Sequence, residues 1–169
     1  MPEFLSRLDV YADGRLIAGR TTFPCRLGRM GIRTDKREGD DATPAGTFAL
    51  REVFYRPDRT ARPATGLPVR EITQPMGWCD DPARADYNRL IRHPYPGSFE
   101  HLWRDDHLYD LVVVIGYNDD PPIPHRGSAI FLHLPGEDAT RGCVALAQDD
   151  WRTVLASCHP ATQITIHPP

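Results

Sequence analysis

A cysteine and a histidine, ten positions apart, are the residues of this sequence best suited to nucleophilic chemistry. His133 lies near the end of one apolar run, and Cys143 follows Gly142 directly before the apolar residues Val144–Leu146. A thiol needs a neighbouring base, because only a few per cent of it is ionised at neutral pH. The pattern therefore indicates a Cys/His pair at the ends of two short strands. A buried structural cysteine is the ordinary alternative, and the two residues alone favour it.

The residues next to Cys143 suit a reaction with a negatively charged intermediate. Gly142 lets the backbone approach a ligand closely and present its N–H groups. Such N–H groups stabilise the oxyanion of an acyl-transfer intermediate. Arg141 adds a positive charge two residues before the thiol.

Short strands are predicted to position this pair. Alternation around Asp13-Gly14 predicts a hairpin over residues 4–23, because Asp-Gly suits a two-residue turn. Four consecutive β-branched residues in Asp110–Gly116 predict a strand buried on both faces. Further strands are predicted over residues 47–55, 129–134 and 162–167, with turn-rich loops over 39–46 and 117–127.

One stretch, Gln148–Cys158, has a convincing helical pattern. Its apolar residues recur at helical spacing on one face, and they are Trp151, Val154, Leu155 and Cys158. With several strands and many turns beside it, the chain is predicted to be mainly β. We expect a β-sandwich or partly closed barrel with one clear helix near the C-terminus. A single domain is expected over residues 1–169.

Residues 56–107 differ from the rest. They contain seven prolines with tryptophan, tyrosine and phenylalanine between them, and no regular period. The aromatic residues argue against disorder. We predict an ordered, irregular excursion that covers or flanks a substrate cleft; a surface insertion merely packed on the core is the equal alternative.

Composition excludes several classes of protein. The net charge of -3 gives no electrostatic basis for binding nucleic acid. No apolar run approaches the ~20 residues that span a bilayer. The start, Met1–Arg7, has no secretory signal pattern. The four cysteines form no C-x-x-C pair, and His93, His101 and His107 have no common metal-site spacing, so no metal or cofactor is expected.

Three ordered motifs resemble those of the L,D-transpeptidases, cell-wall enzymes with a catalytic cysteine. Thr140–Val144 with the upstream His133 is similar to the family signature of a histidine, a spacer and Ser/Thr-His-Gly-Cys. Gly39–Phe48 is similar to the family's Thr-Pro-x-Gly-x-Phe segment. Tyr117–Pro122 and Gly127–His133 resemble a small proteobacterial-type branch.

The resemblance implies a mainly β catalytic domain that acts on peptidoglycan stem peptides, with Cys143 as nucleophile and His133 as base. Loss of a terminal D-alanine would leave a thioester, and the amine of a second stem would then form a cross-link. Gly142, Cys143 and Arg141 would form the oxyanion hole. The resemblance also implies a location in the periplasm or cell envelope and a cysteine that carbapenems acylate. We expect a monomer.

Other residues are predicted to bind substrate. They are Thr140, Tyr117, Asn118, Asp119 and Trp78. For Asp119 the alternative is a turn carboxylate before Pro121-Pro122.

The sequence departs from the family pattern at three points. The spacer between His133 and Cys143 is shorter than usual, Arg141 replaces the signature histidine, and Ala145 replaces a common arginine. Two other readings therefore stay open. One is a thiol carboxypeptidase or amidase acting on the same stems, and the other is a non-catalytic wall-binding domain with a structural Cys143.

Overall fold

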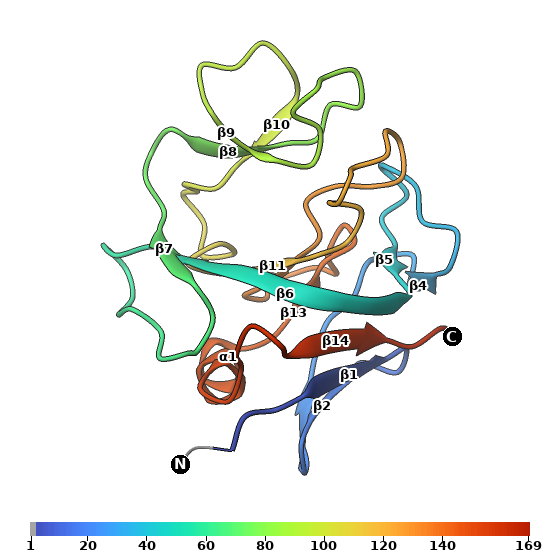
Figure 1. Ribbon diagram of the computed structural model, residues 1–169, viewed down its shortest axis with the longest axis vertical. Coiled ribbons are helices and arrows are strands. Elements are labelled where there is room, and N and C mark those ends of the chain that lie inside the picture. Colours follow the sequence, from blue (N-terminus) through green and yellow to red (C-terminus); the bar gives the residue numbers. More distant parts are fainter. Residues whose placement is uncertain (1–2) are drawn as a thin grey trace.

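The computed structural model describes residues 3–169, so Met1 and Pro2, at the beginning of the start Met1–Arg7, lie outside the described part (Figure 1). The main sheet is formed by β1 (Arg7–Tyr11), β2 (Arg15–Ala18), β3 (Thr21–Pro24), β6 (Gly46–Tyr55), β7 (Val69–Glu71), β11 (Leu111–Ile115), β12 (Phe131–His133), β13 (Val144–Ala145) and β14 (Gln163–Ile166). Its strand order is β13-β12-β11-β6-β14-β1-β2-β3, with β7 beside β6.

The main sheet curls back on itself. Just beyond β3, Arg26 exchanges two backbone hydrogen bonds of 2.9 Å with Ala145 of β13, the strand at the opposite end of the order. A second bridge joins Gly28 to Thr140. A short parallel pair, β4 (Ile32–Arg33) with β5 (Thr43–Pro44), lies in the connection between β3 and β6. The predicted sandwich or partly closed barrel is confirmed, in the form of a curled sheet.

Strand β11 is buried on both faces, as its β-branched run predicts. Leu111, Val113 and Ile115 pack into one apolar cluster, the helix-side core, together with residues of β1, β2 and β14. Val112 and Val114 pack into a second cluster, the site-side core. The site-side core also contains Phe54, Ile72, Met76, Trp78, Leu102, Tyr109, Ala129, Phe131 and Cys143. Period-two alternation of a strand divides its side chains in this way.

Helix α1 (Gln148–Leu155) covers the helix-side core and lies on the same side of β6 as β14 and β1 (Figure 1). Trp151, Val154 and Leu155 are buried, as their spacing predicts. The helix ends three residues before the predicted end, in a turn where Ser157 and Cys158 donate backbone hydrogen bonds to Val154 and Leu155. Cys158 remains fully buried in the helix-side core.

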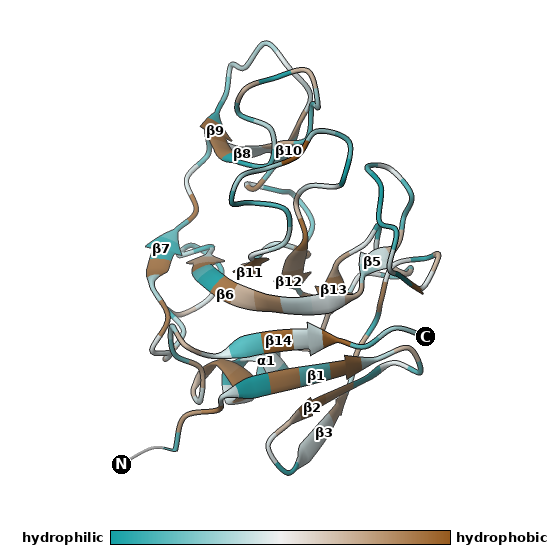
Figure 2. Cartoon of the chain, turned by 45° about the vertical axis from the view of Figure 1, so that its right-hand side comes forward, coloured by the Kyte–Doolittle hydropathy of each residue, from teal (hydrophilic) through white to brown (hydrophobic). Residues whose placement is uncertain are grey.

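The segment predicted to be irregular contains a small sheet. Strands β8 (Met76–Cys79), β9 (Leu90–Arg92) and β10 (Phe99–His101) form an antiparallel sheet of order β10-β8-β9. It lies on the opposite side of β6 and β11 from α1 (Figures 1 and 2). Strands of three or four residues are too short to show a period-two pattern among so many prolines, which explains why the sequence gives no sign of them.

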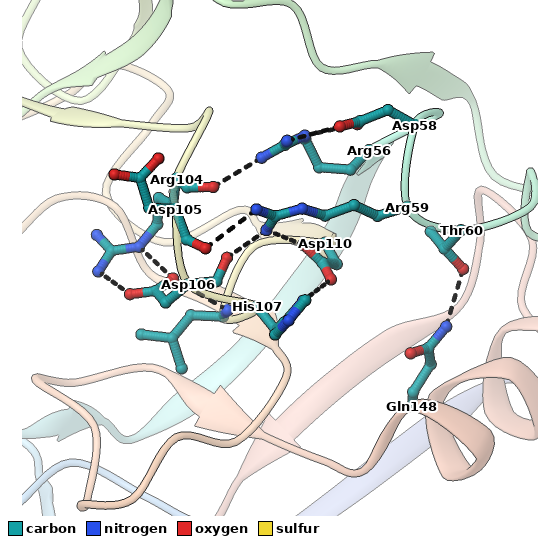
Figure 3. Close-up of polar contacts among 11 residues, drawn as sticks. Arg56, Asp58, Arg59, Thr60, Arg104, Asp105, Asp106, His107, Asp110 and Gln148 are labelled. Atoms are coloured by element: carbon teal, nitrogen blue, oxygen red, sulfur yellow. Dashed lines mark hydrogen bonds and ion pairs between the residues drawn. The ribbon is translucent and has the colours of Figure 1, made fainter.

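Two arginines hold the beginning and the end of this segment together (Figure 3). Arg56 donates to the Arg104 carbonyl at 2.8 Å, and its guanidinium lies 3.6 Å from the centre of the Trp103 ring. Arg59 donates to the carbonyls of Asp105 and Asp106 and pairs with Asp110 at 2.9 Å. This arginine clamp, Arg56 and Arg59, fixes where the chain enters β11.

The other predicted strands are found with small differences in their ends. The hairpin around Asp13-Gly14 forms from β1 and β2, and Gly14 has a φ of 84° that suits the turn. The strand predicted over residues 129–134 is shorter, because only Phe131–His133 pairs as a strand. No helix within residues 3–169 is long and apolar enough to cross a membrane.

Trp151 joins α1 to the end of β12, so its removal should destabilise the fold. The side chain is fully buried, and its indole N–H donates to the His133 carbonyl at 2.8 Å. We expect Trp151→Ala to lower the free energy of unfolding by about 3–5 kcal/mol in urea titrations. Thr153→Ala, on the exposed face of the same helix, should change it by less than about 0.5 kcal/mol. Equal effects would contradict this role for Trp151.

Candidate active site

Strand register brings Cys143 and His133 to one face of the main sheet. β12 and β13 are parallel, and Leu132 lies opposite Val144. Phe131 is therefore the neighbour of Cys143, and His133, two residues further on, faces the same way as Phe131. Both Phe131 and Cys143 belong to the site-side core. The predicted pair thus lies on the face of the sheet that the small sheet covers.

The thiol of Cys143 contacts the backbone of the neighbouring strand. Its Sγ lies 3.4 Å from the amide nitrogen of Phe131, which donates to it, and 3.3 Å from the carbonyl oxygen of Ala129. The residue is 7% exposed. Burial raises the pKa of the Cys143 thiol to about 12, and the negative charge of Glu100 adds to this rise. The resting thiol is therefore protonated.

The imidazole of His133 is held in one tautomer. Its Nδ1 lies 2.6 Å from the Leu134 carbonyl oxygen, which can only accept, so Nδ1 carries the proton and Nε2 is free to act as a base. The ring meets that of Tyr109 edge to face, with centroids 5.4 Å apart. Burial lowers the pKa of His133, so the ring is neutral at neutral pH. Within residues 3–169, no hydrogen bond joins it to the thiol of Cys143.

The backbone at the end of β12 is itself anchored. The His133 carbonyl accepts hydrogen bonds from the Trp151 indole at 2.8 Å and from the Leu146 amide at 3.0 Å. The amide of Leu134 donates to the Leu108 carbonyl at 3.0 Å. The position of His133 is thus fixed by α1, by Leu146 just after β13, and by the chain that leads into β11.

The turn before Cys143 is closed by Thr140. The Thr140 hydroxyl donates to the Cys143 carbonyl at 2.6 Å and accepts from the Gly142 amide at 3.1 Å. An oxyanion hole that uses the Gly142 amide therefore requires Thr140 to release it. Gly142 has a φ of 132°, and a Cβ there would lie 2.8 Å from the Ala42 carbonyl oxygen, so the position requires glycine. Arg141 is exposed beside this turn.

Two of the predicted substrate-binding residues hold their own loop together. The Tyr117 hydroxyl donates to the Arg126 carbonyl at 2.5 Å. The Asn118 amide group bonds to the backbone of Ile123 and Gly127. These bonds shape the loop over residues 117–127, and a role in binding substrate stays a prediction for both residues.

Trp78 and Asp119 lie in a groove of about 370 Å³ beside β6 and β9. Asp119 accepts two hydrogen bonds from Arg51, at 3.0 and 3.1 Å. The indole of Trp78 donates to Asn88 at 2.9 Å, and its ring meets Phe131 edge to face at 5.2 Å. Trp78 thus links this groove to the core around the thiol.

The sequence did not indicate three residues that act on Cys143 or His133, either by contact with the imidazole ring or by an effect of their charge on the thiol pKa. Tyr109 contacts His133, Glu100 raises the pKa of Cys143, and the buried Lys36 lowers it slightly. Lys36 forms an ion pair with Asp40, and it is the only lysine of the chain. Its being the only lysine is the one feature of the sequence that could have drawn attention to Lys36. Glu100 and Tyr109 lie in or beside residues 56–107, where no regular pattern marks them. Within residues 3–169, no three metal-ligating side chains are gathered into a possible site.

Two solved structures align with this chain over most of its length. One is L,D-transpeptidase 1 of Mycobacterium tuberculosis, with 11% identity and a TM-score of 0.41, and the other is an L,D-transpeptidase from Mycobacterium smegmatis, with 13% identity and a TM-score of 0.43. Each alignment covers 96% of this chain but 60% and 58% of those chains, so the chain spans about three fifths of their length. No curated protein matches the chain.

A family model gives the stronger comparison. The model of the L,D-transpeptidase catalytic domain (YkuD) matches residues 5–166, which includes both His133 and Cys143. The chain therefore belongs to the L,D-transpeptidase catalytic-domain family.

Proposed function

We propose that this chain is a cysteine acyltransferase that cross-links peptidoglycan stem peptides. One observation carries the proposal: Cys143 and His133 lie on the same covered face of the sheet, and the histidine has its Nδ1 proton committed to Leu134. A histidine fixed in this tautomer has an unprotonated Nε2, which can accept the proton of a thiol. The family match supports the class of reaction.

The reaction proceeds in two acyl transfers. His133 takes the thiol proton, and the Cys143 sulfur attacks the carbonyl of a diamino acid that precedes a terminal D-alanine. The bond to D-alanine breaks, the amine leaves with the proton from His133, and a thioester remains. The amine of a second stem then attacks the thioester, which restores the thiol and forms the cross-link. Water in place of that amine gives a carboxypeptidase.

In the resting site both the Cys143 thiol and the His133 imidazole are neutral, so the thiol ionises only during the reaction. Burial raises the pKa of Cys143 and lowers that of His133, so a standing thiolate–imidazolium pair is disfavoured. Proton transfer therefore accompanies attack on a bound substrate. Because both residues are less than one tenth exposed, a stem peptide reaches the thiol only when the side chains that cover the pair move aside. We place this reaction in the cell envelope, on the periplasmic side.

Meropenem tests the nucleophile directly. We expect the wild-type chain to gain one meropenem mass in intact-mass measurements and Cys143→Ala to gain none. The other three cysteines, Cys25, Cys79 and Cys158, provide an internal control, because they remain in the variant. An identical adduct on Cys143→Ala would exclude the cysteine as nucleophile and favour the non-catalytic reading.

His133→Ala tests the base. We expect turnover of a disaccharide tetrapeptide to fall by about 10²–10⁴-fold, the usual effect of losing general-base catalysis, with an unchanged circular dichroism spectrum. Mass spectrometry of the wild-type products should show dimers with one D-alanine lost per cross-link. If only monomers shortened by one alanine form, the chain is a carboxypeptidase. Full turnover by His133→Ala would contradict the role of this histidine.

The raised pKa of Cys143 predicts how alkylation depends on pH. The group titrates from neutral thiol to thiolate, so a pKa of about 12 means that the reactive form keeps increasing well above neutral pH. We expect the iodoacetamide rate at Cys143, followed on its own tryptic peptide, to rise about tenfold per pH unit between pH 7 and 10. A plateau near pH 8.5 would indicate an ordinary exposed thiol and would contradict this environment.

A further inference from the structure

Glu100 of the small sheet faces the candidate active site. It lies opposite Trp78 in the β8–β10 pair, and directly opposed residues of antiparallel strands point to the same face. Trp78 packs against Phe131, the residue whose amide contacts the Cys143 sulfur. The side chain of Glu100 is therefore on the inner face of the small sheet, toward the covered face of β12.

A tyrosine holds this carboxylate beside the pair. The Tyr109 hydroxyl donates to Oε2 of Glu100 at 2.7 Å. The same tyrosine ring contacts His133, with centroids 5.4 Å apart, and Phe131, with centroids 5.7 Å apart. Glu100 is thus joined to the site through contacts on both sides, by way of Trp78 and by way of Tyr109.

Within residues 3–169, no arginine or lysine forms an ion pair with the Glu100 carboxylate, whose hydrogen-bond partner is Tyr109. Arg104 is the nearest candidate, but its guanidinium donates to both oxygens of Asp106, at 2.9 and 2.6 Å. Lys36 is paired with Asp40. The other acidic groups that act on Glu100, Asp80 and Glu38, add negative charge. Removal from water raises the pKa of Glu100, while the Tyr109 hydrogen bond and the positive charge of Arg104 act in the opposite direction.

One oxygen of Glu100 is open to a ligand. Oε1 makes no hydrogen bond within residues 3–169, and no fully buried side-chain oxygen or nitrogen there is left without a partner. Oε1 therefore reaches an opening. An oriented carboxylate that forms no ion pair and lies next to a nucleophile is suited to a cationic group of the substrate.

We propose that Glu100, held by Tyr109, binds the free side-chain ammonium group of a stem-peptide diamino acid beside Cys143. This inference rests on the proposed function, which supplies stem peptides that carry such a group as acyl donor or as acceptor. A bound ammonium also cancels the negative charge that opposes ionisation of the thiol. The site is thereby most reactive when the correct substrate is present.

Binding tests this assignment without any turnover. Calorimetry on Cys143→Ala and on Cys143→Ala/Glu100→Gln would use a tetrapeptide donor and a tripeptide acceptor stem, each with a free or acetylated side-chain amine. We expect Glu100→Gln to weaken binding of a free-amine stem about tenfold and to leave its acetylated form unchanged. Loss for the tetrapeptide alone assigns the donor, and loss for the tripeptide alone assigns the acceptor.

A matched control is Glu71→Gln, because Glu71 also accepts a hydrogen bond from a tyrosine hydroxyl, that of Tyr55 at 3.2 Å, but lies exposed on β7. It should bind all stems as the parent does. Equal affinity of Glu100→Gln and its parent for both free-amine stems would overturn the assignment. Failure of every stem to bind the parent would instead overturn the proposed function.

A second measurement depends on neither substrate nor activity. With the Cys143 thiol intact, Glu100→Gln removes a negative charge that opposes thiolate formation. We expect its iodoacetamide rate at Cys143, at pH 8, to be about threefold to tenfold that of wild type. Glu71→Gln should match wild type. An unchanged rate in Glu100→Gln would show that this carboxylate does not act on the thiol, and would remove the basis for the assignment.

Discussion

Strand β11 is buried on both faces. Leu111, Val113 and Ile115 pack into the helix-side core, and Val112 and Val114 pack into the site-side core. A strand buried in this way requires cover on both sides of the sheet. Helix α1 and the β1–β2 hairpin provide one cover, and the small sheet provides the other. The side chains of β12 alternate in the same way, so His133 lies on the face of the sheet that the small sheet covers.

Burial raises the pKa of Cys143, the proposed nucleophile, and lowers that of His133, the proposed base, so both residues are neutral at rest. The thiol holds its proton more tightly, and the imidazole holds a second proton less tightly. Electrostatic interactions inside a buried site of this kind are strong once charge develops on the pair. In the proposed reaction, charge has to arise together with the substrate, and the Glu100 carboxylate is placed to make that dependence specific for a cation.

The sequence was most informative where a pattern repeats. The β-branched run of β11, the Asp-Gly turn and the apolar face of α1 each predict what is found, since each follows a fixed period or a known turn. The pair Cys143 and His133 could be named from residue type and motif. Glu100 and Tyr109 could not, because their relation to Cys143 depends on strand pairings across the segment 56–107, whose strands are too short to show a period. The hydrogen bond from the Gly142 amide to Thr140 was equally invisible, since it arises from turn geometry.

The arginine clamp has a consequence for how such proteins can diverge. Because Arg56 and Arg59 hold residues 104–106 and Asp110, the segment between them leaves and rejoins the barrel at neighbouring points. A loop anchored in this way tolerates changes in length, since doubling it costs only ~0.6 kcal/mol in closure entropy. The connections between the strands of the small sheet can therefore vary in length, while Met76, Trp78 and Leu102 keep their places against β11 and β12.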